Sequence, residues 1–258
     1  MANPEDIQSL IKMTPIPKGK FVMGAKRYTR GYSYEEVPRH SVEITNNFYV
    51  GTHPVTQQLW ERVMGSNPST HIGKNRPVER VSWFSCIRFC NKLSEETGKE
   101  VVYTINGKSV TCNWKAGGYR LLTETEWEYC AKADTKNDTL YYPEKENLYS
   151  GSDNITEVSW FEENSNNETH PVGQKKPNKL GLYDMSGNVC EWVWDWYSPY
   201  SKERKSDPRG PLEGTKRVSR GGSYELPATF LRISNRYRNR PRWSCAWIGL
   251  RIARGKHI

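Results

Sequence analysis

The pattern of hydrophobic and polar positions in the first half of the chain predicts short strands followed by capped helices. Apolar residues alternate with polar ones over residues 20–24 and 41–50, which is the period of a half-buried strand. Three later segments have the apolar spacing of a helix, and each follows a hydroxyl residue that can accept a hydrogen bond from a free backbone N–H. These N-cap residues are Thr56, Ser82 and Thr123. We therefore expect helices and strands to be mixed along the chain.

The second half is predicted to combine a long loop with aromatic strands. Residues 134–180 are polar and rich in asparagine, which is typical of an extended surface loop. Tryptophans alternate within residues 192–196, so they would share one face of a strand. Residues 217–223 indicate a strand that ends at a glycine turn, and residues 248–253 indicate one closing strand.

The basic charge of the chain is confined to its C-terminal part. The formal net charge is +9, from 38 Lys plus Arg and 29 Asp plus Glu. Residues 1–200 hold 23 basic and 25 acidic side chains, whereas residues 201–258 hold 15 basic and 4 acidic ones. A basic patch of this kind is a reason to test for nucleic acid, but no nucleic-acid-binding motif accompanies it. We therefore predict no nucleic-acid partner.

Composition narrows the class of protein further. A hydrophobic content of 35% and an aromatic content of 12% favour a folded chain over a disordered one. No apolar run reaches the ~18 residues of a membrane-spanning helix, so no transmembrane segment is predicted. The six cysteines form no CxxC pair, which argues against a zinc site. We expect them to be small buried side chains, and the sequence assigns no disulfide pairing among them.

Five blocks of sequence resemble one protein family and occur in its order. The block from Tyr119 to Tyr129 reads YRLLTETEWEY and resembles the family's YRLPTEAEWEY, while Gly181 to Trp192 resembles GLYDMxGNVWEW. The other blocks are residues 21–24, residues 76–83, and residues 217–223 with 248–251. The chain is thus similar to the formylglycine-generating-enzyme (sulfatase-modifying factor) family. The resemblance implies one α+β domain over residues 1–258 with that family's version of the C-type lectin fold, short strands, few helices and much irregular chain.

The catalytic cysteines of that family are not matched in this chain. The family's oxidase chemistry uses two cysteines spaced five apart just after the GGS turn, because soft thiolates select copper(I). The matching positions here are Leu226 and Leu231, which have no thiol. We therefore expect a protein that is not an enzyme. The alternative is an oxidase or other enzyme of the formylglycine-generating class with altered chemistry.

The C-terminal segment resembles the variable proteins of diversity-generating retroelements, which also have the C-type lectin fold. In those proteins adenine-directed mutagenesis diversifies codons near the C-terminus. The resemblance implies a scaffold over residues 1–220 and a candidate variable region over residues 221–254. Within the variable region, aromatic, arginine and aliphatic residues follow no regular period, as expected of a binding surface. The predicted ligand-binding residues are Tyr224, Glu225, Leu226, Pro227, Phe230, Tyr237, Arg240, Arg242, Trp243, Ala246 and Trp247. A core segment and a substrate cleft stay open as other readings of these residues.

The same resemblance implies roles for other residues and a setting for the protein. Arg220, Arg232, Arg236 and Arg251 match framework positions, so we expect them to be paired with carboxylates or carbonyls. A structural calcium ion, which prefers oxygen ligands, is also implied. Its ligands would be the side chains of Asp184 and Glu191 and the carbonyls of Gly187 and Val189. No cofactor is required for binding.

The partner is expected to be an unknown ligand, and a protein on another cell or host surface fits best. A broad aromatic face without a deep polar pocket suits a protein better than a small molecule. We expect a monomer. The resemblance places it on the bacterial cell surface as an outer-membrane lipoprotein, although this chain shows no leader sequence.

Overall fold

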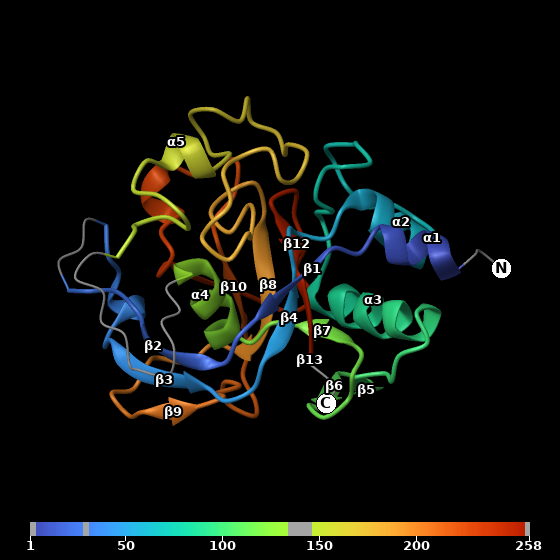
Figure 1. Cartoon of the computed structure of the whole chain (residues 1–258), viewed down its shortest axis with the longest axis horizontal. Coiled ribbons are helices and arrows are strands. Elements are labelled where there is room, and N and C mark those ends of the chain that lie inside the picture. The colour runs from blue at the N-terminus through green and yellow to red at the C-terminus, as the bar shows by residue number, and fades with distance from the viewer. Residues whose placement is uncertain (1–3, 28–30, 134–145, 256–258) are drawn as a thin grey trace.

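The computed structural model describes residues 4–27, 31–133 and 146–255 (Figure 1). Two four-stranded sheets form the centre of the fold. One sheet contains, in order, β1 (Met13–Ile16), β4 (Phe48–Gly51), β13 (Ile252–Gly255) and β7 (Tyr119–Leu121). The other contains, in order, β11 (Arg236–Asn239), β10 (Arg217–Arg220), β8 (Cys190–Trp196) and β12 (Ile248–Leu250).

Two smaller sheets and the helices surround this centre. The smaller sheets are β2 (Gly19–Met23), β3 (His40–Ile44) and β9 (Lys205–Ser206), and the hairpin of β5 (Tyr103–Asn106) and β6 (Ser109–Cys112). The helices are α1 (Pro4–Ser9), α2 (Gln57–Met64), α3 (Trp83–Glu96), α4 (Glu124–Lys132) and α5 (Ile155–Val158), with 3-10 turns at Tyr34–Glu36 and Ala228–Phe230. One buried apolar cluster gathers around α2 and α3, and a second around α4, β2 and β3. Within the described ranges, no helix is long and apolar enough to cross a bilayer.

The helix starts expected from hydroxyl residues are confirmed. Thr56 accepts the backbone N–H of Leu59, and Ser82 that of Ser85. Thr123 forms a capping box with Glu126, in which each side chain accepts the other residue's backbone N–H. The cap at Thr123 positions α4 beneath β10 and β8, where its acidic residues meet the C-terminal arginines described below.

The single closing strand predicted over residues 248–253 is wrong. The chain forms two strands there, β12 and β13, which belong to different sheets. Arg251 separates them because its buried guanidinium donates to the carbonyls of Gly51 (2.8 Å) and Tyr183 (2.7 Å) and pairs with Glu191 (2.8 Å). The alternating hydrophobic pattern continues through this residue, so sequence periodicity alone does not reveal the break.

The alternating tryptophans lie on one face of β8, as predicted. The ring centroids of Trp194 and Trp196 lie 5.6 and 6.5 Å from that of Trp83 at the start of α3. The guanidinium of Arg217 lies 3.6 Å from the ring centroid of Trp196 and 3.8 Å from that of Trp83. This stack of aromatic rings and a cation holds α3 against the strand.

The cysteines form no disulfide among the described residues. All six lie in the described ranges and are free, and Cys86, Cys90, Cys130 and Cys190 are buried. The expectation of small buried side chains is confirmed for these four. Cys112 and Cys245 are half-buried.

A candidate ligand-binding face

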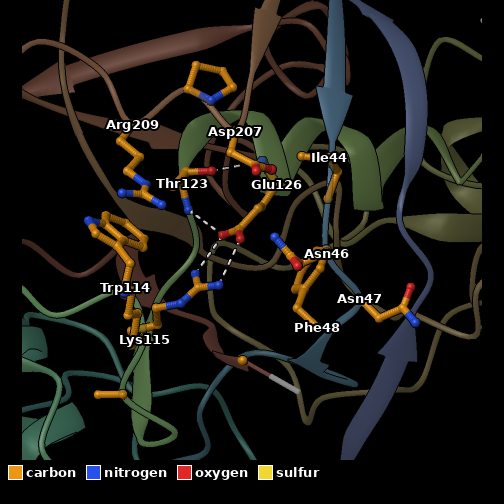
Figure 2. Close-up of a pocket in the computed structure, with 14 residues that line it drawn as sticks. Ile44, Asn46, Asn47, Phe48, Trp114, Lys115, Thr123, Glu126, Asp207 and Arg209 are labelled. Atoms are coloured by element: carbon orange, nitrogen blue, oxygen red, sulfur yellow. Dashed lines mark hydrogen bonds and ion pairs between the residues drawn. The ribbon is translucent and has the colours of Figure 1, made fainter. Parts of the chain in front are cut away.

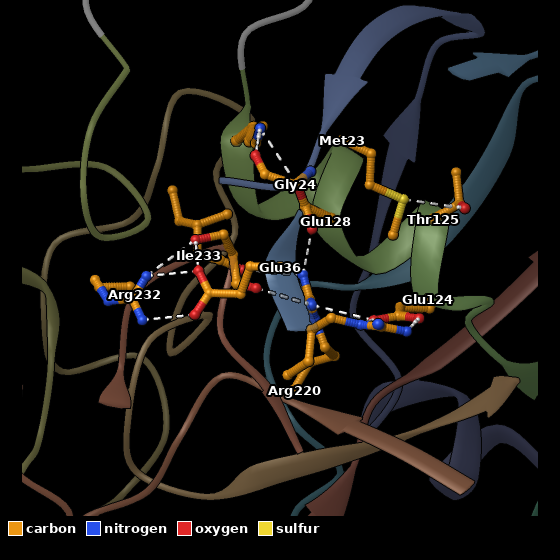
Figure 3. Close-up of polar contacts among 12 residues, drawn as sticks. Met23, Gly24, Glu36, Glu124, Thr125, Glu128, Arg220, Arg232 and Ile233 are labelled. Atoms are coloured by element: carbon orange, nitrogen blue, oxygen red, sulfur yellow. Dashed lines mark hydrogen bonds and ion pairs between the residues drawn. The ribbon is translucent and has the colours of Figure 1, made fainter. Parts of the chain in front are cut away.

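Buried ion pairs anchor the strands that carry the C-terminal region (Figure 3). Glu124 of α4 accepts from Arg236 of β11 at 2.6 and 2.8 Å and from Arg220 of β10 at 3.2 Å. The second amino group of Arg220 bonds to Glu128 one turn further along α4. Burial alone would raise the pKa of Glu124, but the two guanidinium groups hold it below its ordinary value. The strands β10 and β11 are therefore fixed to α4 by charge as well as by packing.

A second buried pair fixes the chain between the 3-10 turn at residues 228–230 and β11. Arg232 donates to both oxygens of Glu36 at 2.6 and 2.7 Å, and Ser234 adds a bond to the same carboxylate at 2.7 Å. Glu35, which precedes Glu36, pairs with Arg238, but the two side chains of that pair are about one-third exposed. Residues far apart in sequence thus clamp the base of the C-terminal region.

The expectation of paired framework arginines is confirmed. All four are at least 95% buried, and each faces a carboxylate; they are Arg220, Arg232, Arg236 and Arg251. Their charges are neutralised inside the protein and cannot reach a nucleic-acid phosphate. Four of the fifteen basic side chains in residues 201–258 are therefore structural.

The candidate variable region, residues 221–254, alternates between the core and the surface. Residues 221–224 are buried, residues 225–230 reach the surface, and residues 231–236 are mostly buried again. Residues 237–247 return to the surface before β12 enters the core. Ten of the eleven predicted ligand-binding residues are exposed or half-buried. We call these ten the C-terminal face: Glu225, Leu226, Pro227, Phe230, Tyr237, Arg240, Arg242, Trp243, Ala246 and Trp247.

Contacts between side chains link the two surface stretches of the C-terminal face. Trp243 meets Trp247 edge to face at 5.0 Å, and Tyr237 lies 6.4 Å from Trp247. The Tyr237 hydroxyl donates to the carbonyl of Phe230 at 2.8 Å. Phe230 is 46% exposed and Trp243 37%, so each presents a large apolar surface to solvent. Leu226 packs its inner side on the small cluster around Phe161.

Tyr224 is the predicted residue that does not reach the surface. It is 3% exposed, and its hydroxyl bonds to His71 Nε2 at 3.0 Å. The ring of His71 packs edge-on against it, with 5.1 Å between centroids. Burial raises the pKa of the Tyr224 hydroxyl, and nearby Glu225 adds to the shift. Tyr224 thus supports the C-terminal face from below.

Scaffold residues that the sequence did not single out also border the face. Glu79 is fully buried and accepts the backbone N–H of His71 at 2.9 Å, which fixes the loop that meets Tyr224. Phe84 of α3 lies under Arg242, 5.4 Å from its guanidinium. These residues precede residue 221, where the candidate variable region begins, by more than 130 positions, so no local sequence signal marks them.

The positions that match the family's cysteine pair belong to packing. Leu231 is fully buried in the cluster with Phe161, and Leu226 lies half-buried against that cluster. The backbone carbonyl of Cys245, which follows them, accepts the backbone N–H of Arg80 at 2.9 Å. Burial raises the pKa of the Cys245 thiol to about 12, which leaves little thiolate at neutral pH.

The predicted calcium ligands do not all offer free oxygens. Both oxygens of Glu191 are bonded, to Arg251 at 2.8–3.1 Å and to Trp127 Nε1 at 2.7 Å. Asp184 accepts from the Gly173 N–H at 2.8 Å, and burial raises its pKa to about 6. The described part of the chain holds no cluster of three acidic, His or Cys side chains suited to a metal. While Arg251 occupies the Glu191 carboxylate, this donor set does not fit calcium.

The fold defines an α+β protein with the C-type lectin fold of the formylglycine-generating-enzyme subclass. The sequence profile of the "Sulfatase-modifying factor enzyme 1-like domain" matches residues 2–256, so the chain belongs to this family.

The chain is also similar to individual proteins of known sequence or structure. Among solved structures, it is similar to Treponema denticola variable protein 1, with a TM-score of 0.84 and 31% identity over 95% of each chain. It is 38% identical to the chaperone protein LppX of Paenibacillus barcinonensis over 73% of each chain. It is 27% identical to the formylglycine-generating enzyme of Mus musculus over 95% of this chain and 75% of that one. It spans 38% of the length of the serine/threonine-protein kinase pkn1 of Chlamydia caviae, which is 31% identical.

Proposed function

We propose that this chain is a non-catalytic ligand-binding protein, the variable protein of a diversity-generating retroelement. The observation that carries the proposal is the separation of exposed side chains from a charged and buried framework. Arg232 and Arg236 hold the backbone by ion pairs in the core, while Phe230 and Trp243 of the same region are exposed. The exposed positions of such a surface that lie away from packed features tolerate substitution, because replacements there change stability by only about 0.5 kcal/mol. In this proposal residues 1–220 are scaffold and residues 221–254 carry the diversity.

A protein is the ligand that the C-terminal face fits best. Trp, Tyr and Arg dominate the energy of protein interfaces, and this face has two tryptophans, a tyrosine and two arginines. Rigid aromatic side chains also lose little conformational entropy when they bind. We propose a monomer that binds a protein on another cell or host surface and does not bind nucleic acid. Its place as a lipoprotein on the bacterial surface rests on the resemblance to variable proteins.

A folding library tests whether the face is a tolerant binding surface. Codons for the ten residues of the C-terminal face would be randomised, and the displayed variants sorted for folding and for binding to hen lysozyme. A control library would randomise exposed positions on the hairpin of β5 and β6. We expect most face variants to fold and lysozyme binders to arise from the face library and not from the control. A face library that mostly unfolds, or yields no more binders than the control, would contradict the proposal.

The second candidate is an enzyme of the formylglycine-generating class, which the similarity to the mouse enzyme keeps open. The absence of thiols at Leu226 and Leu231 disfavours it, because these positions match the family's copper-binding pair. Incubation with copper, oxygen and a sulfatase-type cysteine peptide tests it directly. We expect no aldehyde product, and turnover would refute the non-catalytic assignment.

A further inference from the structure

A pocket of about 450 Å³ lies among segments that the proposed binding function does not use (Figure 2). Its walls come from the turn between β3 and β4, the segment 114–116, the start of α4 and the segment 207–209. None of the ten residues of the C-terminal face lines this pocket, and Leu226 and Ala228 pack instead on the cluster around Phe161. The pocket is therefore separate from the C-terminal face.

The acidic side chains of the pocket are already satisfied. Glu126 accepts both terminal amino groups of Arg120, at 2.6 and 2.8 Å, and the backbone N–H of Thr123 at 2.9 Å. Asp207 accepts the backbone N–H of Thr45 at 2.9 Å and also its hydroxyl. Both oxygens of each carboxylate thus already accept a hydrogen bond, and the charge of Glu126 is balanced by Arg120.

Two cations of the pocket have no such partner. Arg209 and Lys115 are exposed, and neither makes an ion pair with any residue that the structure describes. The Arg209 guanidinium lies 4.3 Å from the ring centroid of Trp114, and Figure 2 shows the two side chains together at one wall. Trp194 meets the edge of that ring at 5.7 Å, which fixes its orientation. A stacked guanidinium is preorganised while its N–H donors stay available.

We propose that this pocket binds a small polar molecule through a carboxylate or phosphate group. Its lining carries three cations and two carboxylates. The Arg120–Glu126 pair is neutral, so Arg209 and Lys115 face only the carboxylate of Asp207, and the pocket has a net positive charge. The planar fork of Arg209 matches either anion with two parallel hydrogen bonds. A neutral sugar is disfavoured, because the guanidinium of Arg209 covers the Trp114 ring on which a sugar would stack. The volume suits a whole molecule, since ligand pockets measure about 300–1,000 Å³.

Calorimetric titration with four probes tests the assignment: inorganic phosphate, glucose 6-phosphate, glucuronate and glucose. We expect glucose 6-phosphate or glucuronate to bind and glucose not to bind, with affinity that falls as salt rises. The probe that binds more tightly tells a phosphate ligand from a carboxylate one, and inorganic phosphate tells a free anion from one carried on a larger body.

Variants show whether the pocket is responsible. Arg209→Gln with Lys115→Gln should raise the Kd at least about tenfold, and Arg209→Lys should lie between this double variant and the parent. Arg240→Gln with Arg242→Gln, on the C-terminal face, is the matched control and should leave the Kd unchanged. Equal binding of glucose and glucuronate, no binding of any anion, or an unchanged Kd in the pocket variant would overturn the proposal. None of these outcomes depends on the function of the C-terminal face.

Discussion

Replacement of Arg232 by methionine tests whether buried ion pairs hold the base of the variable region. Arg232 and Glu36 are 2% and 0% exposed at their side chains and form two hydrogen bonds of 2.6 and 2.7 Å. The substitution keeps a long apolar side chain but leaves Glu36 as a buried charge with no cationic partner. Breaking a buried pair in this way costs about 3–5 kcal/mol. For a domain of this size each kcal/mol lowers Tm by about 2–4 °C, so we expect a fall of roughly 6–20 °C.

Thermal and guanidinium unfolding followed by circular dichroism would measure the loss, with Arg238→Met as the matched control. Arg238 pairs with the neighbouring Glu35, but the two side chains are 36% and 32% exposed. An exposed pair contributes at most about 1 kcal/mol, so the control should change Tm little. Adding Glu36→Leu to Arg232→Met should recover part of the loss, because no unpaired charge then remains. Equal losses for Arg232→Met and Arg238→Met would refute this reasoning.

Three further predictions concern protons, thiols and metal. Burial, with Glu124 adding to it, raises the pKa of Asp195 from 3.8 to about 8, so the folded protein holds a proton that the unfolded chain releases. Stability should therefore fall as pH rises from about 4 to about 8, and Asp195→Asn should flatten that slope in urea unfolding; an unchanged slope would contradict it. Because burial raises the pKa of Cys245 to about 12, Ellman's reagent should react slowly with the native protein and with six thiols after unfolding; fewer than six would reveal a disulfide. Because Arg251 occupies the carboxylate of Glu191, calcium should leave Tm unchanged relative to EDTA, and a rise with calcium concentration would show binding.

The parts of the fold that follow from local rules could be predicted from the sequence. The caps at Thr56, Ser82 and Thr123 each depend on residues within one helical turn, and all three form. The break at Arg251 could not be predicted, because the carbonyls and the carboxylate that draw it out of the strand come from distant segments.

In the candidate site, too, features set by local sequence could be predicted and features set by distant contacts could not. A lack of regular period marked the surface stretches, but it could not show that Tyr224 turns inward to meet His71, 153 positions earlier in the chain. The anion pocket left no sequence signal, because each of its walls contributes only a few residues. Trp114 and Arg209, which meet there, lie 95 positions apart in the sequence, and neither belongs to a recognisable motif.

The nucleotide sequence around the gene tests the central claim most directly. A variable protein of a diversity-generating retroelement requires a near-identical repeat close to the gene. We predict that the two copies differ at adenines of the repeat, and only in codons for surface residues such as 225–227, 230, 237 and 240–247. The codons for Arg232 and Arg236, whose side chains are buried in ion pairs, should be unchanged. Differences spread equally over all four bases, or the absence of any such repeat, would contradict the proposed function.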